Sequence, residues 1–219
     1  MEQMTLDIHD GLAYARVDPA VPARGGVVVL HGADSSKENH LDFAYACAAA
    51  GLSVIVFDQR GHGESEGALG ASALDDVTTM AALLPAGPVF LRGSSMGGFL
   101  ALAAAAHVGA RAVVAICPAS PELLMYGLSE GLFDFRADAA ALRAIVEAID
   151  LQDAARALGP DLMLLHAEAD ERVPLGHSLL LHGAAPASRL VRVPGGHHSS
   201  VQHDERLQRE AVQFLLHRT

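Results

Sequence analysis

The sequence predicts a doubly wound α/β fold, in which a mostly parallel sheet carries helices on both faces. Six short segments are apolar and mostly β-branched, which is typical of parallel strands that are buried on both faces. They are residues 26–32, 53–58, 88–93, 111–117, 161–167 and 188–194. The stretches between and after them suit helices: 39–50, 72–84, 96–107, 139–158, 175–183 and 204–216. This alternation of strand and helix predicts a parallel sheet with right-handed crossovers.

Both ends of the chain add to this plan. Residues 4–18 place Asp10 and Gly11 between two runs of alternating apolar and polar residues, which predicts an antiparallel hairpin at the edge of the sheet. Four apolar residues of the segment 204–216 fall on one helical face: Leu207, Ala211, Phe214 and Leu215. They predict an amphipathic helix at the end of the chain.

The longest departure from the alternation is the segment 118–160. Folds of this type bind ligands at the carboxyl edge of the sheet, and we expect this segment to form a short cap there. No internal repeat, low-complexity tract or linker divides the chain, and 219 residues fit a single α/β domain. The sequence therefore predicts one domain, residues 1–219, with 118–160 as a short cap insertion.

Composition limits the partners that this chain is expected to have. Hydrophobic residues make up 51% and charged residues 19%, which is ample for a core. The formal net charge is −11 and no basic run stands out, so no nucleic-acid partner is expected. The N-terminus lacks the layout of a signal peptide, and no apolar stretch reaches membrane-spanning length without interruption. We therefore expect a cytoplasmic protein with no membrane partner, while its oligomeric state stays open. Cys47 and Cys117 should be buried free thiols.

Three serines have the G-x-S-x-G spacing of a nucleophile on a sharp turn between a strand and a helix: Ser65, Ser95 and Ser129. Ser95 directly follows a predicted strand and precedes a helix, and Gly93 and Gly97 would let the two elements approach closely. Ser65 stands between two glutamates, whose charges would oppose an oxyanion, and Ser129 lies in the predicted cap beside another glutamate. Ser95 is therefore the predicted nucleophile.

A serine nucleophile needs a base, and the base needs an acid that orients it. When the serine lies on this kind of turn, its partners come from loops after later strands, the acid first and the histidine last. Asp170 follows the fifth predicted strand, and His197 and His198 follow the sixth. Asp170 is the predicted acid, with Glu168 and Glu171 as local alternatives, and either histidine could be the base.

Five motifs, in order along nearly the whole chain, point to one family. They are LHG at 30–32, FDQRGHGESEG at 57–67, GSSMGG at 93–98, HAEADERVP at 166–174 and VPGGHH at 193–198. On these motifs the chain resembles the α/β hydrolases of the serine-hydrolase type, among them esterases and acylglycerol-lipase-like enzymes. The resemblance implies the α/β-hydrolase fold and acyl transfer without a cofactor.

The resemblance also implies roles within the site. The family spacing P-G-x-x-H favours His198 over His197 as the base. The backbone N–H of Ala33, which follows the His-Gly pair, would form the oxyanion hole together with the N–H of Met96, which follows the nucleophile.

Two residues depart from the family pattern. Ala167 stands where the family often has glycine, a change that should only stiffen the acid loop. Asp34 lies beside the oxyanion loop, where an inward carboxylate would be unhelpful. We expect Asp34 to face solvent or to pair with Lys37.

The predicted reaction is hydrolysis of a small to medium carboxylic ester through an acyl-enzyme on Ser95, with His198 as the base and Asp170 as its orienting acid. Hydrolysis of a thioester, or of an amide or peptide, by the same triad stays open. So does a non-catalytic α/β-hydrolase-fold binding protein, because a fold does not fix a function. The expected partner is a small-molecule acyl substrate.

The predicted cap is rich in large apolar side chains, some of which should face a cleft above Ser95. The candidate substrate-binding residues are Leu124, Met125, Phe133 and Phe135, with His197.

A metal site is the other interpretation of the histidine-rich segment. His197, His198, His203 and Asp204 lie within eight residues, and imidazole and carboxylate groups are typical zinc ligands. Their spacing matches no established ligand motif, so neither a metal nor a cofactor is predicted.

Overall fold

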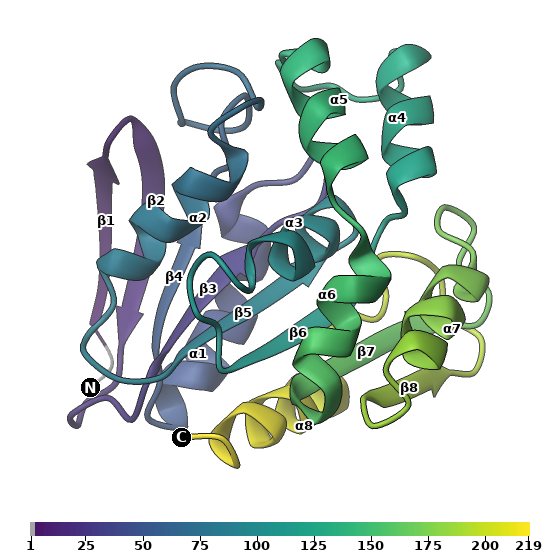
Figure 1. Cartoon of the computed structure of the whole chain (residues 1–219). Coiled ribbons are helices and arrows are strands. Elements are labelled where there is room, and N and C mark those ends of the chain that lie inside the picture. Colours follow the sequence, from purple (N-terminus) through teal and green to yellow (C-terminus); the bar gives the residue numbers. More distant parts are fainter. Residues whose placement is uncertain (1–2) are drawn as a thin grey trace.

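A computed structural model describes residues 3–219 and shows an eight-stranded sheet between two layers of helices (Figure 1). The strands are β1 (Gln3–His9), β2 (Leu12–Asp18), β3 (Gly26–Leu30), β4 (Ser53–Phe57), β5 (Val89–Ser94), β6 (Ala112–Ile116), β7 (Leu162–Ala167) and β8 (Arg189–Val193). Their order in the sheet is β1-β2-β4-β3-β5-β6-β7-β8. The pairs β1–β2 and β2–β4 are antiparallel and all others are parallel, which confirms the doubly wound, mostly parallel sheet.

The helices divide between the two faces of the sheet. They are α1 (Leu41–Ala49), α2 (Ala73–Ala82), α3 (Met96–Ala104), α4 (Pro121–Ser129), α5 (Ala139–Ala148), α6 (Leu151–Leu158), α7 (Leu175–Ala184) and α8 (Glu205–Leu216), with short 3₁₀ helices at Lys37–His40 and Gly159–Asp161. Helices α1 and α8 contact each other on one face, and α2, α3, α6 and α7 follow one another across the other. None of the helices formed by residues 3–219 has both the length and the apolar character that crossing a membrane requires.

The inner strands explain why the sequence shows short apolar runs instead of alternation. Every residue of β3, β4, β6 and β7 is buried, because helices cover both faces of the sheet. One hydrophobic cluster contains Phe99 of α3, and the other contains Phe43 of α1 and Phe214 of α8. Full burial of each large apolar side chain contributes about 1.5–3 kcal/mol, so these clusters hold the layers together.

The hairpin predicted near the N-terminus is present. Strands β1 and β2 pair in register from Gln3 opposite Asp18 to His9 opposite Leu12. Asp10 and Gly11 join the strands with φ values of 52° and 72°, the left-handed conformation that a two-residue hairpin turn requires at both positions.

The structure corrects the helix predicted at 139–158, which is two helices. Ile149 and Asp150 have extended backbone, and the Asp150 side chain accepts hydrogen bonds from the N–H groups of Gln152 and Asp153. An aspartate that caps a new helix competes with continuation of the old one, and the apolar spacing did not reveal this.

Helices α4 and α5 project beyond the carboxyl ends of the strands (Figure 1). Helix α6, which the predicted cap also included, packs instead against α3 and α7.

Candidate active site

Ser95 occupies a strained turn between β5 and α3. Its φ of 53° and ψ of −118° lie where a non-glycine residue costs about 1–3 kcal/mol. The two glycines of the motif permit this turn. A Cβ at Gly93 would lie 2.0 Å from the carbonyl oxygen of Gly97, and a Cβ at Gly97 would lie 2.2 Å from that of Leu30. Strand, helix and the neighbouring strand therefore meet without room for a side chain.

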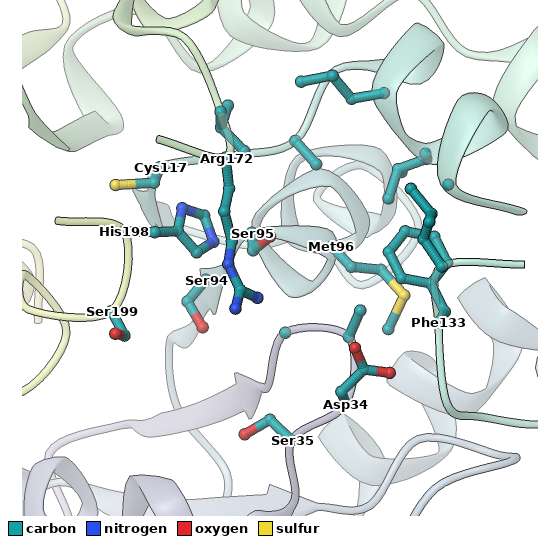
Figure 2. Close-up of a pocket in the computed structure, with 18 of the residues that line it drawn as sticks. Asp34, Ser35, Ser94, Ser95, Met96, Cys117, Phe133, Arg172, His198 and Ser199 are labelled. Atoms are coloured by element: carbon teal, nitrogen blue, oxygen red, sulfur yellow. The ribbon is translucent and has the colours of Figure 1, made fainter. Parts of the chain in front are cut away.

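Backbone hydrogen bonds hold Ser95 in this conformation. Its N–H donates to the carbonyl of Ile116 at 2.9 Å. Its carbonyl accepts from the N–H groups of Phe99 at 3.1 Å and Ala119 at 3.0 Å. The turn is thus fixed by β6 and by its own helix, while the Ser95 side chain faces a cavity (Figure 2).

The two other serines with the same spacing have structural roles. Ser65 is buried; its hydroxyl donates to the carbonyl of Asp58 at 2.5 Å and accepts from the N–H of Ala13 at 2.9 Å. Ser129 ends α4 and donates to the carbonyl of Tyr126 at 2.9 Å. Neither lines the cavity at Ser95.

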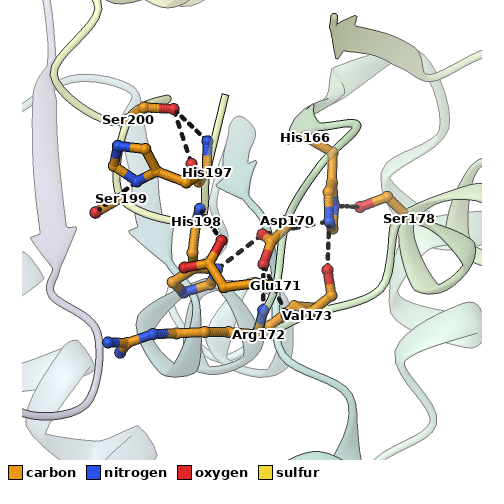
Figure 3. Close-up of polar contacts among 10 residues, drawn as sticks. All are labelled: His166, Asp170, Glu171, Arg172, Val173, Ser178, His197, His198, Ser199 and Ser200. Carbon is orange, nitrogen blue, oxygen red and sulfur yellow. Dashed lines mark hydrogen bonds and ion pairs between the residues drawn. The ribbon is translucent and has the colours of Figure 1, made fainter. Parts of the chain in front are cut away.

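Asp170 and His198 meet on the loops after β7 and β8 (Figure 3). The Nδ1–H of His198 donates to Oδ2 of Asp170 at 2.8 Å, and the carboxylate is fully buried. The other oxygen, Oδ1, accepts from the N–H groups of Arg172 at 2.9 Å and Val173 at 2.8 Å. With Nδ1 engaged, Nε2 is the free nitrogen of the ring, and the ring lies beside Ser95 in the same cavity (Figure 2).

Hydrogen bonds keep the Asp170 carboxylate ionised. Burial alone would raise the pKa of Asp170, but the hydrogen bonds from His198 and from the N–H groups of Val173 and Arg172 hold it well below its usual range.

The Ser95 hydroxyl itself makes no hydrogen bond to His198 among residues 3–219. Such bonds often form with good geometry only when substrate binds.

The structure separates the alternatives that the sequence left open. Glu168 pairs with Arg192 at 2.7 Å, and Glu171 accepts the backbone N–H of His198 at 3.1 Å, so neither contacts the imidazole. His197 is exposed. Its backbone N–H donates to the Ser200 hydroxyl, and its ring Nδ1 is hydrogen-bonded to the Ser199 hydroxyl. It points away from Asp170 (Figure 3).

Two buried residues support the acid loop, and the sequence predicted neither role. The Nε2–H of His166 donates to the carbonyl of Val173 at 2.9 Å, while its Nδ1 accepts from the Ser178 hydroxyl at 2.7 Å. Burial lowers the pKa of His166, so this bridge is a neutral imidazole. Cys117 has a φ of 41° directly after β6. Burial first, and then the neighbouring Asp170, raises the pKa of its thiol.

Cys117, Asp170 and His198 also form a group with the chemistry of metal ligands. Their candidate ligand atoms all lie within 4.8 Å of one another. The two atoms of Asp170 and His198 that approach most closely already share the 2.8 Å hydrogen bond, and Oδ1 already accepts two N–H groups. The arrangement therefore fits a hydrogen-bonded acid–base pair better than an ion site.

The predicted oxyanion residues lie on the same cavity. Ala33 and Met96 line it, and neither backbone N–H has an acceptor among residues 3–219. The start of this loop is anchored by His31, whose Nε2 accepts the N–H of Gln59 at 3.0 Å, and by the Gln59 side chain, which donates to the His31 carbonyl at 2.7 Å. Burial, with His62 nearby, lowers the pKa of His31 to about 4.

Of the two alternatives expected for Asp34, exposure to solvent is found and the pair with Lys37 is not. Asp34 is exposed and lies at the lining of the cavity, and its Oδ1 accepts the backbone N–H of Asp134 at 2.6 Å. Lys37 is instead occupied by Asp58 at 2.8 Å and Glu64 at 2.7 Å. Asp34 thus ties the oxyanion loop to the segment between α4 and α5.

The cavity above Ser95 has a volume of about 560 Å³ and an apolar wall built largely by the segment after β6. Of the predicted substrate-binding residues, Leu124 and Phe133 line it. Other apolar side chains of the lining include Met96, Ile116, Leu123, Tyr126, Leu132 and Val173.

Three of the predicted substrate-binding residues lie elsewhere. Met125 follows Leu124 on α4, about 100° further around the helix, and lines a separate cavity of about 660 Å³. Phe135 stacks on Phe133 at 5.4 Å and on His62 at 4.2 Å, behind the wall. His197 is exposed outside the cavity.

Comparison with known proteins agrees with this fold. Residues 21–128 match the family model Hydrolase_4, described as serine aminopeptidase, S33. No curated protein matches the chain. Among solved structures, Est1E from Butyrivibrio proteoclasticus with bound ferulic acid has a TM-score of 0.78 at 22% identity, covering 98% of both chains. A carboxyl esterase from Bacillus coagulans in complex with glycerol has a TM-score of 0.74 at 16% identity, covering 99% of this chain and 98% of its own.

A third similar structure is the α/β hydrolase domain-containing protein 10 from mouse, with a TM-score of 0.72 at 21% identity over 98% of this chain and 97% of that one. At these identities the structures establish the fold. This fold is the α/β-hydrolase fold, and the family match spans residues 21–128, which include Ala33 and the serine turn.

Proposed function

We propose that this protein is a serine esterase that cleaves carboxylic esters with small to medium acyl groups through an acyl-enzyme on Ser95. The observation that carries the proposal is the 2.8 Å hydrogen bond that Nδ1–H of His198 donates to Oδ2 of Asp170. It leaves Nε2 free in the same cavity as a serine on a strained turn. A base, its orienting acid and a nucleophile in this arrangement suit acyl transfer.

The first half of the reaction forms the acyl-enzyme. The Ser95 Oγ attacks the ester carbonyl carbon while Nε2 of His198 takes the hydroxyl proton. Asp170 stabilises the imidazolium that results. The N–H groups of Ala33 and Met96 stabilise the oxyanion, and removal of one such donor typically costs about 2.7–4 kcal/mol. The tetrahedral intermediate then collapses, and the alcohol leaves with the proton that His198 returns.

The second half releases the acid. A water takes the place of the alcohol, and Nε2 of His198 accepts its proton as the water attacks the acyl carbon. The same two N–H groups stabilise the second oxyanion, and the bond to Ser95 Oγ breaks as His198 returns the proton to it. The reaction is a hydrolysis, and the chain returns to its starting state.

The size of the cavity supports the range of acyl groups. A volume of about 560 Å³ suits a small molecule, and leucine and phenylalanine side chains favour an apolar acyl chain. Each buried methylene contributes at most about 0.8 kcal/mol, so kcat/KM should rise with acyl length until the wall is reached. Est1E, with its bound ferulic acid, and the carboxyl esterase share this fold and are consistent with an ester substrate.

The family description favours a second candidate, an aminopeptidase. Such an enzyme must bind a free α-amino group, and Asp34 is the carboxylate in the cavity lining. Its Oδ1 is already occupied by the N–H of Asp134, which weakens it as an ammonium site. Aminoacyl p-nitroanilides distinguish this candidate from p-nitrophenyl esters.

A fluorophosphonate probe and a panel of esters test the proposal together. The probe should label the wild type and fail to label Ser95→Ala. The panel should contain p-nitrophenyl esters, acyl-thioesters and aminoacyl anilides, and the esters should give the highest kcat/KM. A folded wild type that neither reacts with the probe nor hydrolyses any of these compounds would indicate a binding protein.

A further inference from the structure

Arg172 places a cation at the active-site cavity. It stands two residues after Asp170, and its backbone N–H is one of the donors to that carboxylate. Its side chain lines the cavity and runs past the His198 ring (Figures 2 and 3). Arg172 and Asp170 share one short loop, and Asp170 binds His198, so a group held by Arg172 would lie close to the base.

No carboxylate among residues 3–219 neutralises this guanidinium by an ion pair. Within this range, eleven of the 15 lysine and arginine side chains do make such a pair, so Arg172 belongs to a minority of four. The two acids beside it in sequence are occupied. Asp170 binds His198 and two backbone N–H groups, and Glu171 accepts the backbone N–H of His198.

The cavity has two chemically different sides. Its apolar side is formed by the cap and α3: Met96, Leu123, Leu124, Leu132 and Phe133. Its polar side surrounds His198: Ser94, Arg172, Ser199 and Gln202. Figure 2 shows Met96 and Phe133 on one side of Ser95, and His198 and Ser199 on the other. The Ser94 hydroxyl is buried with no hydrogen-bond partner among residues 3–219, which leaves a donor on the polar side.

The reaction decides which half of an ester occupies each side. His198 must deliver its proton to the leaving oxygen, so the alcohol half lies on the His198 side and the acyl half against the apolar wall. A guanidinium with no protein partner pairs best with a carboxylate or phosphate, by two parallel hydrogen bonds. Asp34 lies toward the Met96 and Phe133 side, where its charge would repel an anionic acyl group (Figure 2).

We propose that the natural substrate is an ester whose alcohol half carries an anionic group, which Arg172 binds. This inference rests on the proposed esterase function and specifies its substrate. The acyl half is apolar and uncharged, and the leaving alcohol bears a carboxylate or another oxyanion. Arg172 thereby selects substrates through the part of the molecule that departs first.

The test compares two butyrate esters of the same shape. One has a para-carboxyphenyl alcohol half and the other a para-carbamoylphenyl alcohol half, and they differ in charge. The measured quantity is the ratio of their kcat/KM values in wild type, Arg172→Gln and Arg143→Gln. Arg143 is an exposed residue of α5, so its variant controls for the change in net charge. Taking the ratio cancels any damage to the acid loop.

The ratio should fall about three- to tenfold in Arg172→Gln, recover in part in Arg172→Lys, and stay unchanged in Arg143→Gln. Added salt should reduce the wild-type ratio and leave that of Arg172→Gln unaffected. An equal loss on both esters would assign Arg172 to loop structure alone, and an unchanged ratio would overturn the proposal.

A binding measurement keeps this test separate from the esterase assignment. Calorimetry on wild type and Arg172→Gln should compare para-hydroxybenzoate with para-hydroxybenzamide, the two alcohol products. Preference for the benzoate in wild type, lost in the variant, would support the anion site even if no ester is hydrolysed. Equal affinity for both compounds in wild type would reject the anion site, whatever the hydrolysis panel shows.

Discussion

The serine turn and the helices α4 and α5 of the predicted cap differ in how closely the rest of the molecule packs against them. Every residue of α3 is buried, and the turn before it leaves no room for a Cβ at Gly93 or Gly97. Helix α4 buries only Leu124 and Gly127, and α5 only two residues. The part to which we assign the chemistry is therefore fixed by close packing, and the part proposed to contact the substrate is loosely held. Substitutions should affect rate and stability at the turn, and selectivity in the cap.

The largest expected effect is on catalysis at the turn. Ser95→Ala and His198→Ala should each lower kcat by about 10⁴–10⁶, and the double variant should lose little more, because the residues act as one unit. The measurement is kcat for p-nitrophenyl butyrate at enzyme concentrations high enough to detect the residual rate. His197→Ala is the matched control and should keep most activity. Loss in His197→Ala with activity retained in His198→Ala would move the base by one residue.

A substitution that disturbs the packing at the serine turn should also cause the largest loss of stability. In Gly97→Ala the new Cβ would lie 2.2 Å from the Leu30 carbonyl oxygen and 2.4 Å from that of His31, and backbone cannot easily move. We expect a loss of more than about 4 kcal/mol, which lowers Tm by roughly 10 °C or more in a chain of this size.

The control for this prediction is Gly183→Ala. Gly183 lies in α7, and a Cβ added there would meet no atom of another element within 4 Å, so alanine should raise Tm by roughly 1–3 °C through helix propensity. A Tm for Gly97→Ala within about 2 °C of wild type would contradict the packing account of the turn.

The same contrast explains what the sequence could predict. The serine turn, the Asp10-Gly11 hairpin and the positions of Asp170 and His198 are encoded by neighbours in sequence, because glycine geometry and strand ends are local properties. The directions in which Met125 and Phe135 face, and the hydrogen bond that Asp134 donates to Asp34, depend on what packs against each element. The break at Ile149 comes from the Asp150 cap, which the apolar spacing does not reveal. An apolar pattern specifies that a residue is buried, and it does not specify which cavity or wall buries it.

Cys117 shows this limit most clearly. The sequence predicted a buried thiol and gave no reason to connect it with Asp170, which lies 53 positions away on the next strand's loop. The only signal was position, since Cys117 directly follows β6 at the sheet edge where Asp170 follows β7. Proximity of strand ends could have suggested the contact, but not the orientation of either side chain.

The free energy of unfolding should fall in acid because His31 is buried as a neutral imidazole. The unfolded chain takes up a proton on this residue near pH 6.5, and the folded chain only near its pKa of about 4. Between these values the unfolded state binds more protons, so the free energy of unfolding falls as pH falls. At about 1.4 kcal/mol per pH unit, this residue accounts for about 3 kcal/mol.

Urea unfolding at a series of pH values checks this prediction. His31→Gln should be less stable than wild type at pH 7 and should lose about 3 kcal/mol less between pH 6.5 and 4. The control is His107→Gln, an exposed position, which should follow the wild-type curve. Parallel curves for wild type and His31→Gln would show that the imidazole is not held neutral by burial.

The smallest effect should come from the cap, where Leu124 and Met125 form a matched pair on α4. Leu124 lines the cavity above Ser95, and Met125 lines the other cavity. Leu124→Ala should open space for a longer acyl chain and shift the preferred ester by one to two carbons. Each methylene contributes at most about 0.8 kcal/mol, so the change is about fourfold in relative kcat/KM per carbon. Met125→Ala should leave the preference unchanged. A shift in Met125→Ala, or none in Leu124→Ala, would mean that the acyl group does not lie against this wall, while the Ser95 chemistry would be unaffected.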